Sequence, residues 1–479
     1  MAVVFSFTSL CLLLVLGKVL RLKIGLFQRL YLPASVLGGV AGLMVFQTVL
    51  GVGKFVLAYA DPNAPTGLES VMTALVALQA DATLGWGRLP GLLINIVFAA
   101  LFLGVTIPPL KTIWQKSGPQ LAYGQIVAWG QYVVGLGLAL AVLAPFLKVP
   151  AFIGTIIPVG FEGGHGTAGG LKETFEFFGW AEGADFALAS ATAGIVSAII
   201  VGMALINWAV RHGYTQKLKR IEDMPSSSIS GVYAVDERPS AGKQTVSADS
   251  VDSLALHLAL IGVAVFIGYF MKLGLVRVES LSDVLSEKKF LAGFPLFPLC
   301  MIGGLGVQLF LSRVARTDLI DHQLMQRLSG TAMDFLVVAA ISTIRLPVIL
   351  SGLAPFALLV VAGIAWNVFC VVWLARRLLP KGAWFERAIT EMGQSMGVTA
   401  TGLLLLRVVD PEHETDAVSA FGYKQLLHEP FMGGGLWTSI AVPLAITQGP
   451  VIVFAISLGA IAVWLVVWAG LFRHGAGES

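Results

Sequence analysis

The chain has 479 residues, of which 56% are hydrophobic and only 12% are Asp, Glu, Lys or Arg, and its formal net charge is +3. Soluble globular proteins carry about 25% charged residues, so this chain has about half of the charge needed to cover a water-soluble core. The composition excludes a soluble enzyme, a disordered chain and a coiled coil, and the small net charge argues against a nucleic-acid partner. It predicts an all-α polytopic membrane protein.

Stretches of about 20 apolar residues are long enough to cross the hydrocarbon core, and they recur along the chain. We expect about 10–11 transmembrane helices, with candidate spans at 3–20, 32–52, 90–108, 120–144, 184–210, 254–273, 291–312, 329–345, 347–375, 431–447 and 450–472. The apolar segment 68–80 is short and is followed by Asp81, so we expect an external or half-inserted helix there. No cleavage signature follows the first apolar stretch, which favours a retained span over a signal peptide.

The basic residues predict the orientation, because positively charged loops stay cytoplasmic. With the N-terminus outside, the cytoplasmic loops hold 21 Lys and Arg residues, Lys424 among them, against 9 in the external loops. The polar, serine-rich segment 211–253 is then a cytoplasmic linker. It separates a first half, 1–210, that begins outside from a second half, 254–479, that begins inside, so any repeat between them is inverted.

Each half contains, late in its course, an apolar segment interrupted by glycines. The first lies near 150–172 and includes Gly163-Gly-His-Gly-Thr167, and the second lies near 385–406 and includes Gly393 to Gly402. Paired, glycine-interrupted segments in two inverted halves indicate the binding site of a transporter near the bilayer midplane. Non-helical backbone at that depth requires a cavity around it. A resuming helix offers N–H groups to a carboxylate, and carbonyl and threonine oxygens suit sodium.

The sequence resembles the bacterial sodium/glutamate symporter family in three stretches. These are Tyr31-Leu-Pro-Ala-Ser-Val-Leu-Gly-Gly39, Gly163-Gly-His-Gly-Thr167, and Gly393 to Thr401. The resemblance implies two inverted repeats, each with a glycine-rich re-entrant loop, in a homodimer of the bacterial inner membrane. It also implies sodium-driven import of glutamate. The chain departs from the family where the second loop lacks the usual proline and where Leu405 replaces an asparagine, and 450–472 is an additional C-terminal helix.

From these features we expect one substrate site and one ion site. The substrate-site candidates are Gly163, Gly164, His165, Gly166, Thr167 and Arg407, and the ion-site candidates are Thr399, Thr401, Gly397 and Glu162.

Each candidate side chain also has a structural interpretation. His165 either donates to a substrate carboxylate or satisfies nearby carbonyls. Glu162 either carries a cation or forms an ion pair. Thr399 and Thr401 either bind sodium or bond back to their own helix. Arg407 either meets a carboxylate or extends to the interface.

We therefore expect a sodium-driven symporter of glutamate or a similar acidic amino acid, with no enzymatic activity and no cofactor besides sodium. The alternative is a sodium- or proton-coupled carrier of another organic anion, such as a di- or hydroxycarboxylate. An enzyme is disfavoured because only seven histidines occur and none stands in HExxH spacing. Cys11, Cys300 and Cys370 lie in apolar runs without CxxC spacing, which argues against a disulfide framework and a zinc site.

The orientation can be tested with a cysteine at Ser228. Because the linker is expected to be cytoplasmic, a membrane-impermeant thiol reagent should leave this cysteine unmodified in intact cells and modify it after permeabilisation. The unsubstituted chain is the control for labelling of its own three cysteines. Full modification in intact cells would reverse the orientation.

Overall fold

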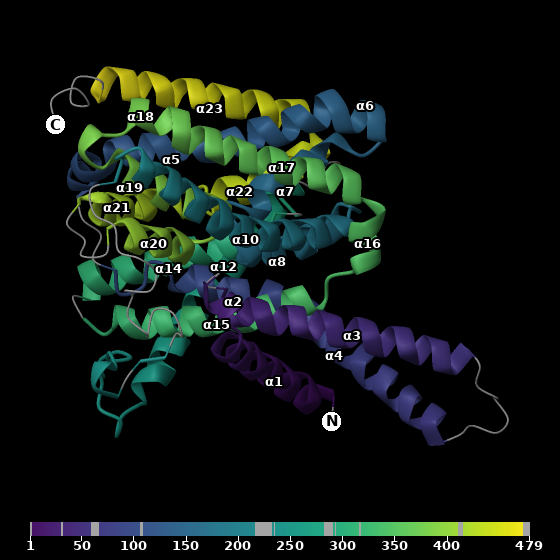
Figure 1. Ribbon diagram of the computed structural model, residues 1–479. Helices are drawn as coiled ribbons and strands as arrows, with labels where there is room; N and C mark the ends of the chain where they lie inside the picture. Colours follow the sequence, from purple (N-terminus) through teal and green to yellow (C-terminus); the bar gives the residue numbers. More distant parts are fainter. Residues whose placement is uncertain are drawn as a thin grey trace.

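The computed structural model describes residues 2–29, 32–58, 67–105, 109–215, 232–233, 235–281, 291–292, 294–315, 318–410 and 415–472. The regular elements in these ranges are all helices (Figure 1). The first half contains α1 (Ala2–Lys23), α2 (Gly25–Arg29), α3 (Ala34–Ala58), α4 (Gly67–Ala100), α5 (Leu110–Leu138), η1 (Ala139–Leu143), α6 (Ala144–Leu147), η2 (Ala151–Thr155), α7 (Ile156–Gly160), α8 (Gly164–Gly170), α9 (Lys172–Phe177) and α10 (Glu182–Arg211).

The second half continues in the same manner. It contains η4 (Val235–Glu237), α12 (Ser253–Glu279), α14 (Phe297–Leu309), η5 (Phe310–Ala315), α15 (His322–Ser342), α16 (Leu346–Ser351), α17 (Leu353–Phe369), η6 (Cys370–Leu374), α18 (Ala375–Leu378), η7 (Lys381–Ala383), α19 (Trp384–Met396), α20 (Thr399–Val409), α21 (Ala417–His428), α22 (Leu436–Thr447) and α23 (Pro450–Leu471).

The helices form two bundles, which lie one below the other in Figure 1. The lower bundle consists of α1, α3, α4, α12, α14 and α15, and the upper bundle consists of α5, α10, α17 and α19 to α23. Small residues allow close crossings within a bundle. A Cβ atom on Gly38 of α3 would lie only 2.5 Å from the carbonyl oxygen of Leu13 in α1. The short helices α7 to α9 pack between the bundles, where α8 contacts both α10 and α4.

Both halves distribute their helices in the same order. In each half, three helices enter the lower bundle first: α1, α3 and α4, then α12, α14 and α15. Each half then adds one long helix to the upper bundle, α5 or α17, and this helix is followed by a broken helix, α7–α8 or α19–α20. The last helix, α23, packs on α5 and has no counterpart in this repeated order.

Eight helices in the described residues are long and apolar enough to cross a membrane. They are Val4–Lys23, Trp114–Leu147, Glu182–Arg211, Ser253–Glu279, Phe297–Ala315, His322–Ser342, Leu353–Leu378 and Pro450–Leu471. The chain is therefore a multi-pass membrane protein by this criterion. The remaining expected spans correspond to shorter apolar helices in α3, α4 and α22.

Two sequence-based expectations about the spans are wrong. The segment 68–80 and the expected span that begins at 90 are not two elements, because both lie in α4, which runs without interruption from Gly67 to Ala100 and contains Asp81. An aspartate inside a helix costs less than about 1 kcal/mol, so it does not by itself end one. The expected span 431–447 is wrong too, because its helix α22 has only 12 residues.

The polar segment 211–253 lies between two long helices. Helix α10 ends at Arg211 and α12 begins at Ser253, where the Asp252 carboxylate accepts hydrogen bonds from the first backbone N–H groups of the helix. Part of the segment between them, 216–231 with the labelling position Ser228, lies outside the described residues.

One ion pair fixes the N-terminal end of α10 to the connection between α15 and α16. Asp185 accepts from the backbone N–H of Arg345 at 2.7 Å and from its guanidinium Nε at 2.9 Å. Arg345 therefore pairs across the fold and not with Asp334, which lies three helical turns away along the sequence.

Candidate functional site

Three helices break where the two bundles meet. We call the breaks the first tip (161–163, between α7 and α8), the second tip (397–398, between α19 and α20) and the third tip (429–435, between α21 and α22). A Cβ atom on Gly164, whose φ is +64°, would lie 3.1 Å from Val398 Cγ1. A Cβ atom on Gly434, whose φ is +89°, would lie 1.9 Å from Thr167 Oγ1. Only glycine combines these φ values with such close approach, so it brings the three tips into contact.

A cavity of about 380 Å³ opens at the tips, between them and helices α3, α4 and α15. The sequence-predicted residues that line it are Glu162, Gly163, His165, Gly166, Thr167 and Thr399. The two glycine-interrupted segments that the sequence paired are thus adjacent in space, and they share one cavity.

The other predicted residues lie behind this lining or away from it. Gly164 lies at the contact between the first and second tips. Thr401 is buried, and a Cβ atom on Gly397 would lie 2.9 Å from its hydroxyl oxygen. Arg407 is exposed on α20 and does not line the cavity.

The carboxylate of Glu162 is oriented by a chain of donors that starts at Trp129. The indole N–H of Trp129 donates to Gln125 Oε1 at 3.0 Å, and Gln125 Nε2 lies 3.2 Å from His428 Nδ1. Because an indole nitrogen only donates, the amide orientation is fixed and Nδ1 must accept. The proton of the ring is then on Nε2, which lies 2.6 Å from Glu162 Oε1.

A second donor reaches the same oxygen of Glu162. Gln394 Nε2 donates to Glu162 Oε1 at 2.8 Å, while Gln394 Oε1 accepts from the Lys424 ammonium at 3.2 Å. The other oxygen of this carboxylate, Oε2, is buried and makes no hydrogen bond. Since Glu162 lines the cavity, it offers one unpaired acceptor to a ligand there.

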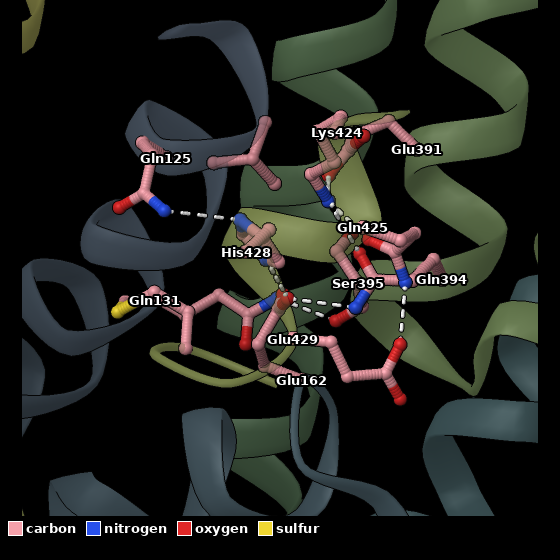
Figure 2. Close-up of polar contacts among 12 residues, drawn as sticks. Gln125, Gln131, Glu162, Glu391, Gln394, Ser395, Lys424, Gln425, His428 and Glu429 are labelled. Carbon is pink, nitrogen blue, oxygen red and sulfur yellow. Dashed lines mark hydrogen bonds and ion pairs between the residues drawn. The ribbon is translucent and has the colours of Figure 1, made fainter. Parts of the chain in front are cut away.

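Lys424 is the central cation of the site, and Figure 2 shows the polar side chains gathered around it. Its ammonium donates to Glu391 Oε1 at 2.6 Å and to Gln425 Oε1 at 2.9 Å, in addition to Gln394. Lys424 and Glu391 both have completely buried side chains. The three protons of the ammonium thus have three oxygen acceptors, two on α19 and one on α21.

Glu429 is held in a similar manner on the other side of the cavity. Its Oε2 accepts from the Thr399 hydroxyl at 3.1 Å and from Gln425 Nε2 at 2.9 Å. Gln425 Nε2 also lies 2.7 Å from Thr399 Oγ1. The hydroxyl of Thr399 therefore bonds across to α21 and not back to its own helix, so one of its lone pairs remains for a ligand.

The ring N–H group of His165 is already used within the protein, so it is not free to donate to a substrate carboxylate. Its Nε2 lies 2.9 Å from the hydroxyl of Thr192, and that hydroxyl donates to the Leu188 carbonyl at 3.1 Å. Nε2 must therefore donate to Thr192, which leaves Nδ1 as the free nitrogen and, in the neutral ring, an acceptor. In this arrangement His165 suits a ligand N–H group better than a carboxylate.

The charges around the cavity are unbalanced. Glu162, Asp334 and Glu429 line it, whereas none of its described lining residues is a lysine or arginine. Lys424 does not line the cavity itself, but its ammonium donates to Gln394, which does. An anion therefore meets like charges in this cavity unless cations accompany it.

Several residues of the site were not predicted from the sequence. They are Gln120, Gln125, Glu391, Gln394, Lys424, Gln425, His428 and Glu429. The assignment of Lys424 to a cytoplasmic loop is wrong, because its ammonium is buried among carboxylate and amide oxygens. A signal was present: Lys424, Gln425, His428 and Glu429 recur at helical spacing and form one polar face.

Comparison with known proteins identifies a family for this chain. The family model described as Sodium/glutamate symporter matches residues 87–411, about two thirds of the chain. No curated protein and no solved structure matches significantly. The matched segment includes the first and second tips and ends before α21, which supplies Lys424 and His428.

The buried ion pair leads to a test of stability. Replacement of Lys424 by Met leaves the Glu391 carboxylate buried without its counter-charge, which is expected to cost about 3–5 kcal/mol. Thermal unfolding of the purified protein should show a clear loss of stability. The double variant Lys424→Met/Glu391→Gln removes both charges and should recover most of it. A double variant as unstable as Lys424→Met would show that the ion pair is not the cause.

The contact between the first two tips leads to a test of transport. Gly164→Ala places a Cβ atom against Val398 at a positive φ, and Gly179→Ala is the matched control because its φ is +75° with nothing within 4 Å. Both substitutions cost about 1–2 kcal/mol of backbone strain. Only Gly164→Ala is expected to reduce the rate of transport per molecule in the membrane several-fold. Equal transport rates in the two variants would show that the contact between the tips is not needed for transport.

Proposed function

We propose, because the chain belongs to the sodium/glutamate symporter family, that the cavity at the three tips is where glutamate or a similar acidic amino acid binds together with sodium. Family membership makes the protein a sodium-driven glutamate symporter in a membrane, and it points to transport and not to catalysis. The observation that carries the placement of the site is the unpaired, buried oxygen of Glu162 in a cavity lined by three carboxylates.

Sodium has a physical role in such a cavity. Glutamate carries a net negative charge, and Glu162, Asp334 and Glu429 repel it in a medium of low dielectric constant. Sodium ions bound to carboxylate, hydroxyl and carbonyl oxygens remove this repulsion. The side chains in place to hold them are Glu162 through Oε2 and Thr399 through its hydroxyl, with Gly397 and Thr401 behind them. Substrate then binds only after or with sodium, which couples the two fluxes.

The substrate lies between the tips in this proposal. Thr399 and Ala400, in the first turn of α20, line the cavity, and the N-terminus of a helix favours a carboxylate. Gly163 and Gly166 of the first tip and α8 let a ligand approach the backbone closely. His165 Nδ1 and the hydroxyl of Thr167 take polar groups of the substrate. Arg407 has no part in this arrangement, because it lies away from the cavity.

The arrangement of the helices supports a movement of one bundle against the other during transport. The repeated order of three helices, one long helix and one broken helix supports two inverted repeats, with the first and second tips as re-entrant loops from opposite sides. The upper bundle carries all three tips, and it would move against the lower bundle, which would form the scaffold of a homodimer in a bacterial inner membrane. The polar linker 211–253 joins the two repeats.

Transport assays on proteoliposomes test this proposal. Uptake of radiolabelled glutamate is expected to rise several-fold with an inward sodium gradient and to exceed uptake of citrate and malate. Thr399→Val removes a proposed sodium ligand, so it should raise the sodium concentration for half-maximal uptake several-fold.

Thr447→Val is the matched control, because the Thr447 hydroxyl bonds to its own helix and does not line the cavity. It should leave the sodium dependence unchanged. Full glutamate uptake driven by a pH gradient in sodium-free buffer would contradict the proposal. Faster uptake of malate than of glutamate would instead favour the dicarboxylate alternative.

A further inference from the structure

A second cavity, of about 410 Å³, lies at the other end of α8. Helix α4 lines both cavities. Its residues Ile94 and Phe98 line the first cavity, and Arg88 and Asn95 line the second. Ile94, Phe98 and Phe297 are buried between the two cavities, and the rings of Phe98 and Phe297 lie 4.8 Å apart. An apolar barrier thus separates two cavities along one helix.

The second cavity has the opposite charge balance to the first. Arg88 and Lys272 line it together with one carboxylate, Glu173, which gives a net charge of +1 from these groups. The Lys272 ammonium donates to the backbone carbonyl oxygens of Leu291, Ala292 and Phe294. These acceptors are neutral, and the opposite charge that acts on Lys272 comes from Glu279, whose carboxylate accepts from the backbone N–H groups of Leu291 and Ala292 outside the cavity lining. Arg88 is exposed at the rim of the cavity.

A buried acceptor in this cavity also lacks a partner. Asn95 is 8% exposed, and its amide Nδ2 donates to the Gly91 carbonyl at 2.8 Å. This bond fixes the amide orientation, since a flipped amide would place two oxygens together. The amide oxygen Oδ1 is buried and makes no hydrogen bond. A buried, unpaired acceptor beside Glu173 is suited to an ammonium group on a ligand.

We propose that this second cavity is a separate binding site for an acidic amino acid, occupied before the substrate reaches the tips. One carboxylate of the ligand pairs with the Arg88 guanidinium, and the other is attracted by the positive charge of Lys272, whose protons stay on the backbone carbonyls. The ammonium group of the ligand pairs with Glu173 and Asn95 Oδ1. The net charge of −1 on such a ligand complements the +1 of the cavity. Binding here therefore needs no sodium, in contrast to binding at the first cavity. This inference rests on the proposed function, because it takes the same substrate.

The test measures binding of radiolabelled L-glutamate to the full-length protein in nanodiscs without sodium. Wild type is expected to bind saturably and weakly, and Arg88→Gln to weaken this binding at least fivefold while Arg88→Lys retains part of it. Asn95→Leu should weaken it as well. Glutarate, which lacks the ammonium group, should compete at least tenfold less well than unlabelled glutamate, because it leaves Glu173 and Asn95 Oδ1 unpaired.

Uptake into proteoliposomes gives the second measurement. Arg88→Gln should raise the KM for glutamate more than it lowers the maximal rate, with the half-saturating sodium concentration unchanged. Lys148→Gln is the matched control, since Lys148 is exposed and lies outside the lining of the second cavity. It should match wild type in both assays.

The outcomes separate this inference from the proposed function. Sodium-driven glutamate uptake by wild type, together with no saturable binding in sodium-free buffer, would overturn the second site and leave the first intact. Equal effects of Arg88→Gln and Lys148→Gln, or equal competition by glutarate and glutamate, would overturn it as well. Failure of wild type to transport glutamate at all would instead count against the proposed function.

Discussion

The ammonium group of Lys424 is the interaction on which the site depends. An ammonium has three protons and no acceptor, and in a buried position each proton requires an oxygen. Glu391 and Gln394 on α19 and Gln425 on α21 supply these oxygens, so the cation fixes two broken helices relative to each other. The orientation of Gln394 follows, and with it the donor that reaches Glu162. A single cation thus determines which oxygen of a carboxylate on a third broken helix is left free.

In the proposed mechanism, the two cavities divide the task of bringing an anion into the bilayer. A carboxylate-lined cavity excludes an anion by itself, and this exclusion is what makes sodium necessary for binding there. A cavity with a positive balance collects the same anion from water without sodium. The apolar side chains of Ile94, Phe98 and Phe297 between them prevent the two environments from merging. Because α8 reaches from one cavity to the other, a displacement of the first tip acts on both.

The sequence was informative where physics restricts the choice of residue, and less so elsewhere. Glycine at 164 is required by a positive φ and a close contact, and the glycine-rich breaks predicted the first two tips from the sequence alone. The third tip was missed, because its helix α22 is apolar and had the composition of an ordinary span. Lys424 was misassigned because counting basic residues treats each lysine as solvated, whereas this one is paired in the interior. Hydropathy likewise could not tell that α4 continues through Asp81, since a helix tolerates an isolated polar residue.

The position of Lys424 in the chain also bears on the order of assembly. The carboxylates of Glu162 and Glu391 are synthesised first, and their partners His428 and Lys424 lie downstream on α21. Segments that have already entered the bilayer therefore hold two acids without counter-groups until the ribosome has delivered α21. During that interval the broken helices have reason to remain near the water interface, where a carboxylate is solvated. Closure of the tips is then a late event in biogenesis, because it requires the two partners that α21 supplies.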